Sequence, residues 1–193
     1  IIRIYVLWII VGAIFPATHR APLQAPQTVQ TLHPQVCVHT DLKDEVDEWK
    51  IQRSLQLVRE MGATTIVEYF PWAYAESNED QYQWYQFDRI TRHAQNQGLR
   101  VIARLGLVPD WARPKETTLN YLPEESFDDF VQYAVDFATR YAGIIDDIVI
   151  WNEPNLAFEW GYQDVSPERY VRLLQAVYQP LHDANPNINV LAG

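Results

Sequence analysis

Short apolar runs alternate with longer amphipathic stretches along most of the chain. The short runs are rich in β-branched and aromatic residues and predict strands, whereas apolar positions three or four residues apart predict helices. The predicted strands cover residues 35–39, 64–70, 100–105, 147–151 and 188–191, and the predicted helices cover residues 44–61, 86–97, 126–142 and 166–181. This alternation is typical of βα units that build a parallel sheet.

Local signals mark several helix ends. Gly62, Gly98 and Gly143 follow predicted helices, where glycine commonly ends a helix. Ser126 with Asp129 predicts a capping box at the start of one helix. Ser166 followed by Pro167 predicts an N-cap at the start of another.

Polar and aromatic residues gather just after the predicted strands, and no glycine-rich phosphate turn follows any of them. This favours a (β/α)8 TIM barrel over a doubly wound sheet, because the strand ends of a barrel converge on one mouth. A complete barrel needs about 250 residues and eight strands. We therefore expect a partial barrel of about strands 1 to 5 within residues 35–193, as the N-terminal part of a longer catalytic domain.

The first 34 residues differ from the rest. Residues 4–17 carry no charge and predict a signal peptide or a membrane anchor within residues 1–20, and these two alternatives stay open. A buried core helix is a third, less favoured alternative. Either one predicts a protein that is secreted or anchored on the outer face of the membrane. Residues 21–34 are rich in Pro, Gln and Thr without periodicity and predict a linker.

Composition narrows the function classes. The formal net charge of -10 disfavours a nucleic-acid partner, because phosphate binding needs clustered Lys and Arg. The single cysteine, Cys37, excludes an intramolecular disulfide and a cysteine-based zinc cluster, and we expect it to lie in the core. We expect no metal and no cofactor, because His39 with Asp41 is too sparse a set of ligands.

The most informative motif is Trp-Asn-Glu-Pro-Asn at residues 151–155, directly after a predicted strand. Pro154 disfavours helical geometry at the preceding residue and is expected to hold Glu153 extended. At a barrel mouth, desolvation can raise the pKa of such a carboxyl until it acts as a general acid. Asn152 can donate to a hydroxyl beside the reacting carbon. Taken alone, the motif is equally compatible with a loop and a capping Asn.

Together with Tyr-Phe-Pro-Trp at residues 69–72, Gly-Leu-Arg-Val-Ile at residues 98–102 and Pro-x-Trp-Ala at residues 109–112, the motif resembles the clan A glycoside hydrolases. The resemblance is greatest to families 39 and 5 and covers residues 35–193. It implies a retaining glycosidase with Glu153 as acid/base and Asn152 at the sugar 2-hydroxyl. The nucleophile that it implies is a Glu on the seventh strand, beyond this chain, so the present residues alone are expected to be inactive.

Other residues complete the predicted site. His39 is expected to hydrogen-bond a sugar hydroxyl, and Trp72, Trp111 and Trp160 to stack on sugar rings, with an oligo- or polysaccharide as substrate. His39 as an ordinary loop residue stays an alternative. Glu68 is expected to be buried and paired with an arginine such as Arg104, and the loop carboxylates Asp110 and Glu159 are expected to be solvated. The competing functions are a non-catalytic carbohydrate-binding protein with the same barrel and a metal-dependent barrel hydrolase.

Overall fold

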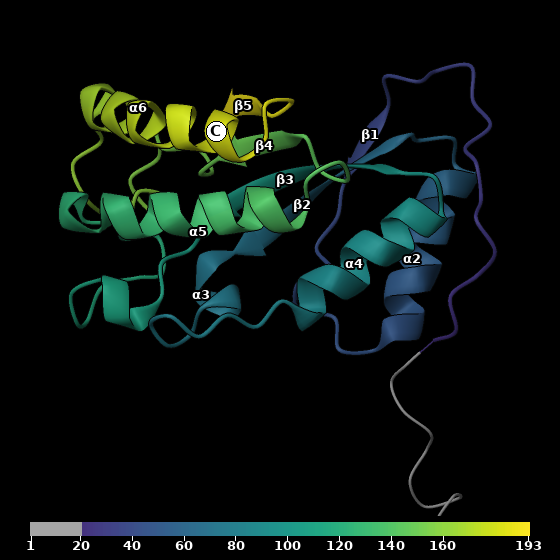
Figure 1. The fold of residues 1–193 in the computed structure, drawn as a ribbon, viewed down its shortest axis with the longest axis horizontal. Coiled ribbons are helices and arrows are strands. Elements are labelled where there is room, and N and C mark those ends of the chain that lie inside the picture. The colour runs from purple at the N-terminus through teal and green to yellow at the C-terminus, as the bar shows by residue number, and fades with distance from the viewer. Residues whose placement is uncertain (1–20) are drawn as a thin grey trace, which may run out of the picture.

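The computed structural model describes residues 21–193, so the predicted signal peptide or anchor in residues 1–20 lies outside the described part. Within residues 21–193 five strands form one parallel sheet in the order β1-β2-β3-β4-β5 (Figure 1). Their bounds are Cys37–His39, Thr65–Pro71, Arg100–Gly106, Asp147–Ile150 and Asn189–Ala192. Every predicted strand is present within a few residues of its predicted ends.

The four longest helices of residues 21–193 connect the strands and lie on one side of the sheet (Figure 1). They are α2 (Glu48–Glu60), α4 (Tyr85–Asn96), α5 (Phe127–Arg140) and α6 (Pro167–Ala184). Because parallel crossovers are right-handed, a strand order that never reverses places all the helices on the same face. A doubly wound sheet has a reversal of strand order, and residues 21–193 contain none. The chain is therefore a partial (β/α)8 barrel.

The two faces of the sheet differ in burial. Residues that face the helices, such as Ile66, Leu105 and Ile150, are fully buried in one continuous core. The inner face consists of the alternate residues, and several of them are half-buried or exposed: Cys37, His39, Tyr69, Ile102 and Arg104. Cys37 is exposed, so the expectation of a core cysteine is wrong. The cause is its register, which puts it on the inner face of an edge strand.

Of the two helix caps predicted from the sequence, one is present in the structure and the other is not. The Ser166 hydroxyl accepts the Arg169 amide at 3.2 Å, which confirms the predicted N-cap. The capping box at Ser126 is wrong, because a 3-10 turn (η2, Glu124–Ser126) leads directly into α5 and Ser126 lacks the extended backbone of an N-cap. Its hydroxyl donates instead to the Ala112 carbonyl at 2.8 Å.

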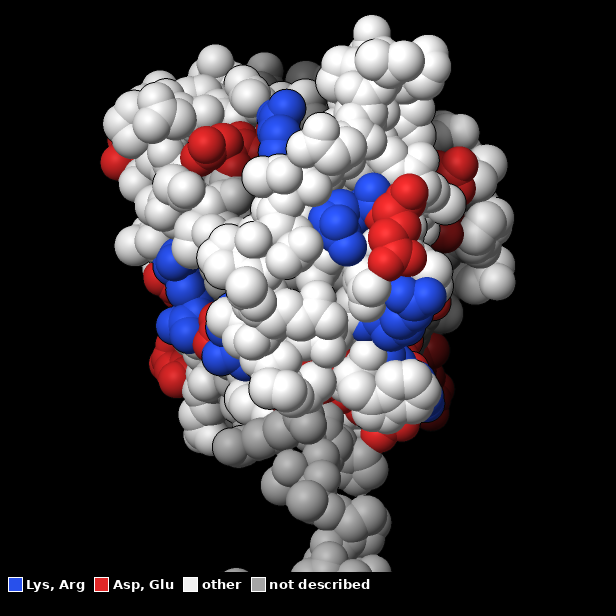
Figure 2. Space-filling model, turned by 90° about the vertical axis from the view of Figure 1, so that its right-hand side faces the viewer, with Lys and Arg blue, Asp and Glu red and all other residues white. Residues whose placement is uncertain are grey.

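Residues 21–34 have almost no regular structure, yet they make specific contacts with α2 and α4. The Gln27 amide donates to the Asn96 carbonyl at 2.8 Å, and the Gln52 side chain donates to the Pro22 carbonyl at 2.6 Å. Figure 2 looks onto this side of the molecule, where basic and acidic side chains lie side by side between uncharged ones. Within residues 21–193, no helix combines the length and apolar character needed to cross a lipid bilayer.

Candidate functional site at the carboxyl end of β4

The backbone changes direction sharply where β4 ends. The Trp151 amide still donates to the Leu105 carbonyl at 2.8 Å, so the sheet continues to this residue. Trp151 and Glu153 then have φ angles of 72° and 40°, a region that non-glycine residues rarely adopt and that costs about 1–3 kcal/mol each. The expectation that Pro154 holds Glu153 extended is wrong. Proline disfavours only the right-handed helical region for the preceding residue, and Glu153 adopts the left-handed one.

The Trp151 indole anchors the loop that follows. It is 1% exposed and packs edge-on against Trp160 and Phe130, with ring centroids 5.5 Å and 6.0 Å away. Its indole N–H donates to the Glu159 carbonyl at 2.8 Å. The strained turn is therefore fixed on one side by a buried ring, which leaves the next two side chains outside the core.

Those two side chains are Asn152, the predicted contact of the sugar 2-hydroxyl, and Glu153, the predicted acid/base. Asn152 is half-buried and Glu153 is exposed, and within residues 21–193 neither side chain is held by a hydrogen bond or an ion pair. An unpaired carboxyl and an unpaired amide therefore follow the strand end, where they can meet a ligand. The sequence predicted that Glu153 would be buried at the barrel mouth, but residues 21–193 leave its side chain exposed.

Two other predicted site residues lie at or just after strand ends. His39 ends β1 and is exposed on the inner face. Trp111 lies in a 3-10 turn after β3 (η1, Asp110–Ala112), is half-buried, and donates its indole N–H to the Glu76 carbonyl at 2.9 Å. Both can be approached from solvent in this structure.

The remaining two tryptophans belong to the core. Trp72 and Trp160 are both 0% exposed. Trp72 opens a short helix that the sequence did not predict (α3, Trp72–Ala75) and is stacked on Tyr133 at 6.1 Å. Trp160 lies between Trp151 and Tyr170. Protein atoms cover both indoles, so neither offers a face to a sugar in this structure.

Glu68 has a different role from the expected one. It is 1% exposed but faces the helices, whereas Arg104 is on the inner face, so the expected ion pair is absent. Its carboxylate accepts the Thr40 hydroxyl at 2.6 Å and the Leu42 amide at 3.0 Å, which ties the loop after β1 to β2. Burial raises the pKa of Glu68, and these hydrogen bonds only partly offset that effect.

Three residues of the inner face were missed in the sequence analysis as site candidates. Tyr69 and Arg104 are in register on β2 and β3, and Gly106 follows two residues later. A Cβ atom at Gly106 would collide with the Tyr69 hydroxyl, so the glycine leaves that hydroxyl its space. The alternation of buried Val101, Ala103 and Leu105 with the other residues of β3 was the signal that could have placed Arg104 on this face.

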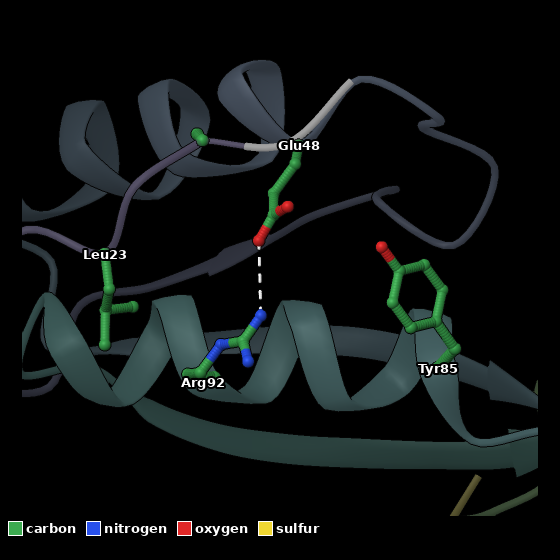
Figure 3. A pocket seen from close by; sticks show the side chains of 5 residues that line it. Leu23, Glu48, Tyr85 and Arg92 are labelled. Carbon is green, nitrogen blue, oxygen red and sulfur yellow. Dashed lines mark hydrogen bonds and ion pairs between the residues drawn. The ribbon is translucent and has the colours of Figure 1, made fainter. Parts of the chain in front are cut away.

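Two cavities of the described part are lined by residues other than Asn152 and Glu153. One cavity of about 360 Å³ lies on the outer layer between α2, α4 and the start of the described chain, where Arg92 points toward Glu48 (Figure 3). Another of about 210 Å³ is lined by Tyr82, Trp111 and several carboxylates. Residues 21–193 contain no group of three or more His, Cys, Asp or Glu residues placed to hold a metal ion.

No family model matches the sequence, and no curated protein matches it. Solved structures of glycosidases do match its fold. A family 39 glycoside hydrolase from the gut symbiont Bacteroides cellulosilyticus is 21% identical with a TM-score of 0.65, over 88% of this chain and 33% of the enzyme. An exo-β-1,4-mannosidase from an Opitutaceae bacterium is 14% identical with a TM-score of 0.65, over 90% of this chain and 35% of the enzyme.

A third match is GH5_18 from Streptomyces cattleya, solved in complex with GlcNAc, at 14% identity and a TM-score of 0.62. It covers 89% of this chain and 45% of that protein. The chain has the fold of part of a (β/α)8 barrel, which it shares with these solved structures. The expected resemblance to clan A glycoside hydrolases is thus confirmed for the fold, and the chain spans less than half the length of these enzymes.

Proposed function

We propose that this chain supplies the first five strands of the catalytic barrel of a retaining O-glycosidase that acts on an oligo- or polysaccharide. The observation that carries the proposal is the unpaired Asn152 and Glu153 directly after β4, on a strained turn within a fold shared with glycosidases. The composition of residues 4–17 supports a location outside the cell or on the outer face of the membrane.

In the proposed mechanism Glu153 is the general acid and then the general base. Its carboxyl protonates the leaving oxygen, and the same group later removes a proton from the attacking water. Asn152 donates its amide to the 2-hydroxyl, a contact that strengthens as positive charge develops at the anomeric carbon. The remaining strands of the barrel would supply the burial that Glu153 lacks among residues 21–193.

Retention requires a second carboxylate about 5–5.5 Å from the first. The candidates weighed from the sequence are engaged elsewhere: Glu68 faces the helices, Asp110 pairs with Arg113, and Glu159 accepts the Asn120 amide at 3.3 Å. The nucleophile is therefore assigned to a later strand of a longer protein. His39 and Trp111 remain the proposed sugar contacts, because both can be approached from solvent.

The test is the dependence of hydrolysis on the leaving group, measured on the full-length protein. Glu153→Gln should reduce kcat/KM for glycosides with poor leaving groups by about 10²–10⁴-fold, and far less for activated aryl glycosides that need no protonation. The matched control is Glu125→Gln, an exposed carboxylate in the 3-10 turn η2 before α5 that should change neither rate. Equal losses on both substrate types would refute the acid role.

A non-catalytic carbohydrate-binding protein is the second candidate, favoured by the occupied carboxylates described above. It predicts saturable binding of glycans to the full-length protein with no hydrolysis of either substrate type. Detectable turnover that depends on Glu153 would exclude it.

A further inference from the structure

Arg104 is the unusual arginine of the described residues 21–193. Every other arginine in residues 21–193 is held by a hydrogen bond or an ion pair. Arg104 is half-buried, its Nε atom is buried without a partner, and no hydrogen bond or ion pair within this range engages its guanidinium. Buried donors that are left unpaired cost free energy, so such a group is expected to have a partner other than residues 21–193.

The surroundings of Arg104 indicate the kind of partner. It lies on the inner face in register with Tyr69 on β2, two residues before Gly106 at the end of β3. Tyr69 is half-buried, and within residues 21–193 its hydroxyl has no hydrogen bond. Burial and the Glu159 charge raise the pKa of Tyr69, and the nearby Arg104 charge opposes them, so the phenol stays a neutral donor. A fork of guanidinium N–H groups beside a phenolic O–H suits an oxyanion.

We propose that Arg104 and Tyr69 form a subsite for an anionic substituent of the glycan, the carboxylate of a uronic acid or a sulfate ester. The inference rests on the proposed function, because it assumes that the inner face near β4 receives a sugar. The guanidinium provides paired N–H donors to two oxygens, and the Tyr69 hydroxyl donates to one of them. The substituent would be the partner that Arg104 lacks among residues 21–193.

The overall charge limits the substrate further. A net charge of -10 repels polyanions at long range, so selectivity for an acidic glycan has to come from a local, partly buried contact. This favours a glycan with isolated acidic groups over a densely charged polymer.

The test uses the full-length protein with Glu153→Gln, which prevents turnover, on an array that holds each acidic glycan beside its carboxyl-reduced or desulfated counterpart. We expect at least one acidic member to bind about 10- to 100-fold more tightly than its neutral counterpart, that is by about 1.4 to 2.8 kcal/mol. Arg104→Gln should abolish the preference, and Tyr69→Phe should reduce it. The uronate and sulfate members then identify the substituent.

Two further variants keep the result interpretable. Arg100→Gln makes the same charge change at the exposed start of the same strand, where Arg100 pairs with Asp147, and should keep the preference. Arg104→Lys keeps the positive charge but lacks the paired N–H donors of the guanidinium, so it should retain part of the preference for acidic glycans. A partial preference in this variant would show that the loss in Arg104→Gln does not come from a folding defect.

Equal binding of acidic and neutral members, absence of any acidic binder, or a preserved preference in Arg104→Gln would overturn the inference. Hydrolysis of neutral glycans that depends on Glu153 would in that case leave the proposed function intact. Binding of acidic glycans without hydrolysis by the protein with its natural Glu153 would instead support the subsite and refute the glycosidase.

Discussion

Replacing Glu48 by Gln is expected to destabilise the fold without touching the candidate site. Glu48 is the first residue of α2, is 3% exposed, and receives three donors from other parts of the chain. One carboxylate oxygen lies 3.2 Å from an Arg92 nitrogen (Figure 3). The same oxygen lies 2.9 Å from His93 Nε2, also on α4, and the Ala21 amide donates to this carboxylate. The substitution keeps the shape of the side chain and removes its charge.

The magnitude follows from the burial of each partner. His93 is 1% exposed, and a hydrogen bond to a charged group contributes about 1.5–3 kcal/mol. The Arg92 side chain is 55% exposed, so solvent screening limits its pairing to about 0–1 kcal/mol. We therefore expect Glu48→Gln to lower the free energy of unfolding by about 2–4 kcal/mol at pH 7.

The loss should depend on pH in a defined direction. Burial alone raises the pKa of Glu48, but the His93 hydrogen bond, the Ala21 amide and the nearby charges outweigh it, so the pKa falls below its ordinary value of 4.5. A lowered pKa means that the ionised group stabilises the fold above the unfolded value, and that this contribution is lost as pH falls through the folded value. The difference between the two proteins should therefore shrink below about pH 4.

The assay is urea denaturation at pH 7 and at pH 3.5, followed by circular dichroism. Glu125→Gln, which removes an exposed carboxylate, is the control and should stay within about 0.5 kcal/mol of the unsubstituted protein at both pH values. A loss below about 0.5 kcal/mol at pH 7 would show that the buried cluster is not stabilising. A loss of equal size at both pH values would contradict the assigned lowering of the pKa.

Two further substitutions test the core and the strained turn. Phe70→Ala should cost about 3–5 kcal/mol, because Phe70 is 0% exposed and packs edge-on against Phe87 at 5.0 Å; Leu32→Ala, at a side chain 92% exposed, should cost almost nothing in the same denaturation assay. Glu153→Gly should raise the melting temperature, since glycine relieves a φ of 40°. An unchanged or lower melting temperature would argue against backbone strain at that residue.

The position of the candidate pair could be predicted from the sequence, but its geometry could not. Residues 147–151 were predicted as a strand from four apolar or β-branched positions, which placed Asn152 and Glu153 at its carboxyl end. The left-handed backbone of Trp151 and Glu153 depends on where the Trp151 indole finds a buried place, against Phe130 on α5. No local pattern contains that contact.

The local sequence also did not predict which side chains of each strand face the helices and which lie on the inner face of the sheet. In β2 the apolar residues fall on both faces, so the period of two did not show which side Glu68 would occupy. Pairing with β1 and β3 decided it, placing Glu68 beneath the helices and leaving Arg104 on the inner face. The burial of Trp72 arises in the same way, from its stacking on Tyr133 of α5, which is distant in the sequence. Trp160 is buried by its packing against Trp151 and Tyr170.

By itself, the sequence determined the order of strands and helices, the barrel class and the residues that follow each strand, because these depend on periodicity and turn chemistry over short spans. The tertiary structure alone decided which side chains are buried, which are paired and which stay free on the inner face. Those properties depend on the register between strands and on packing across the helix layer. Both involve contacts between residues that are far apart in the sequence.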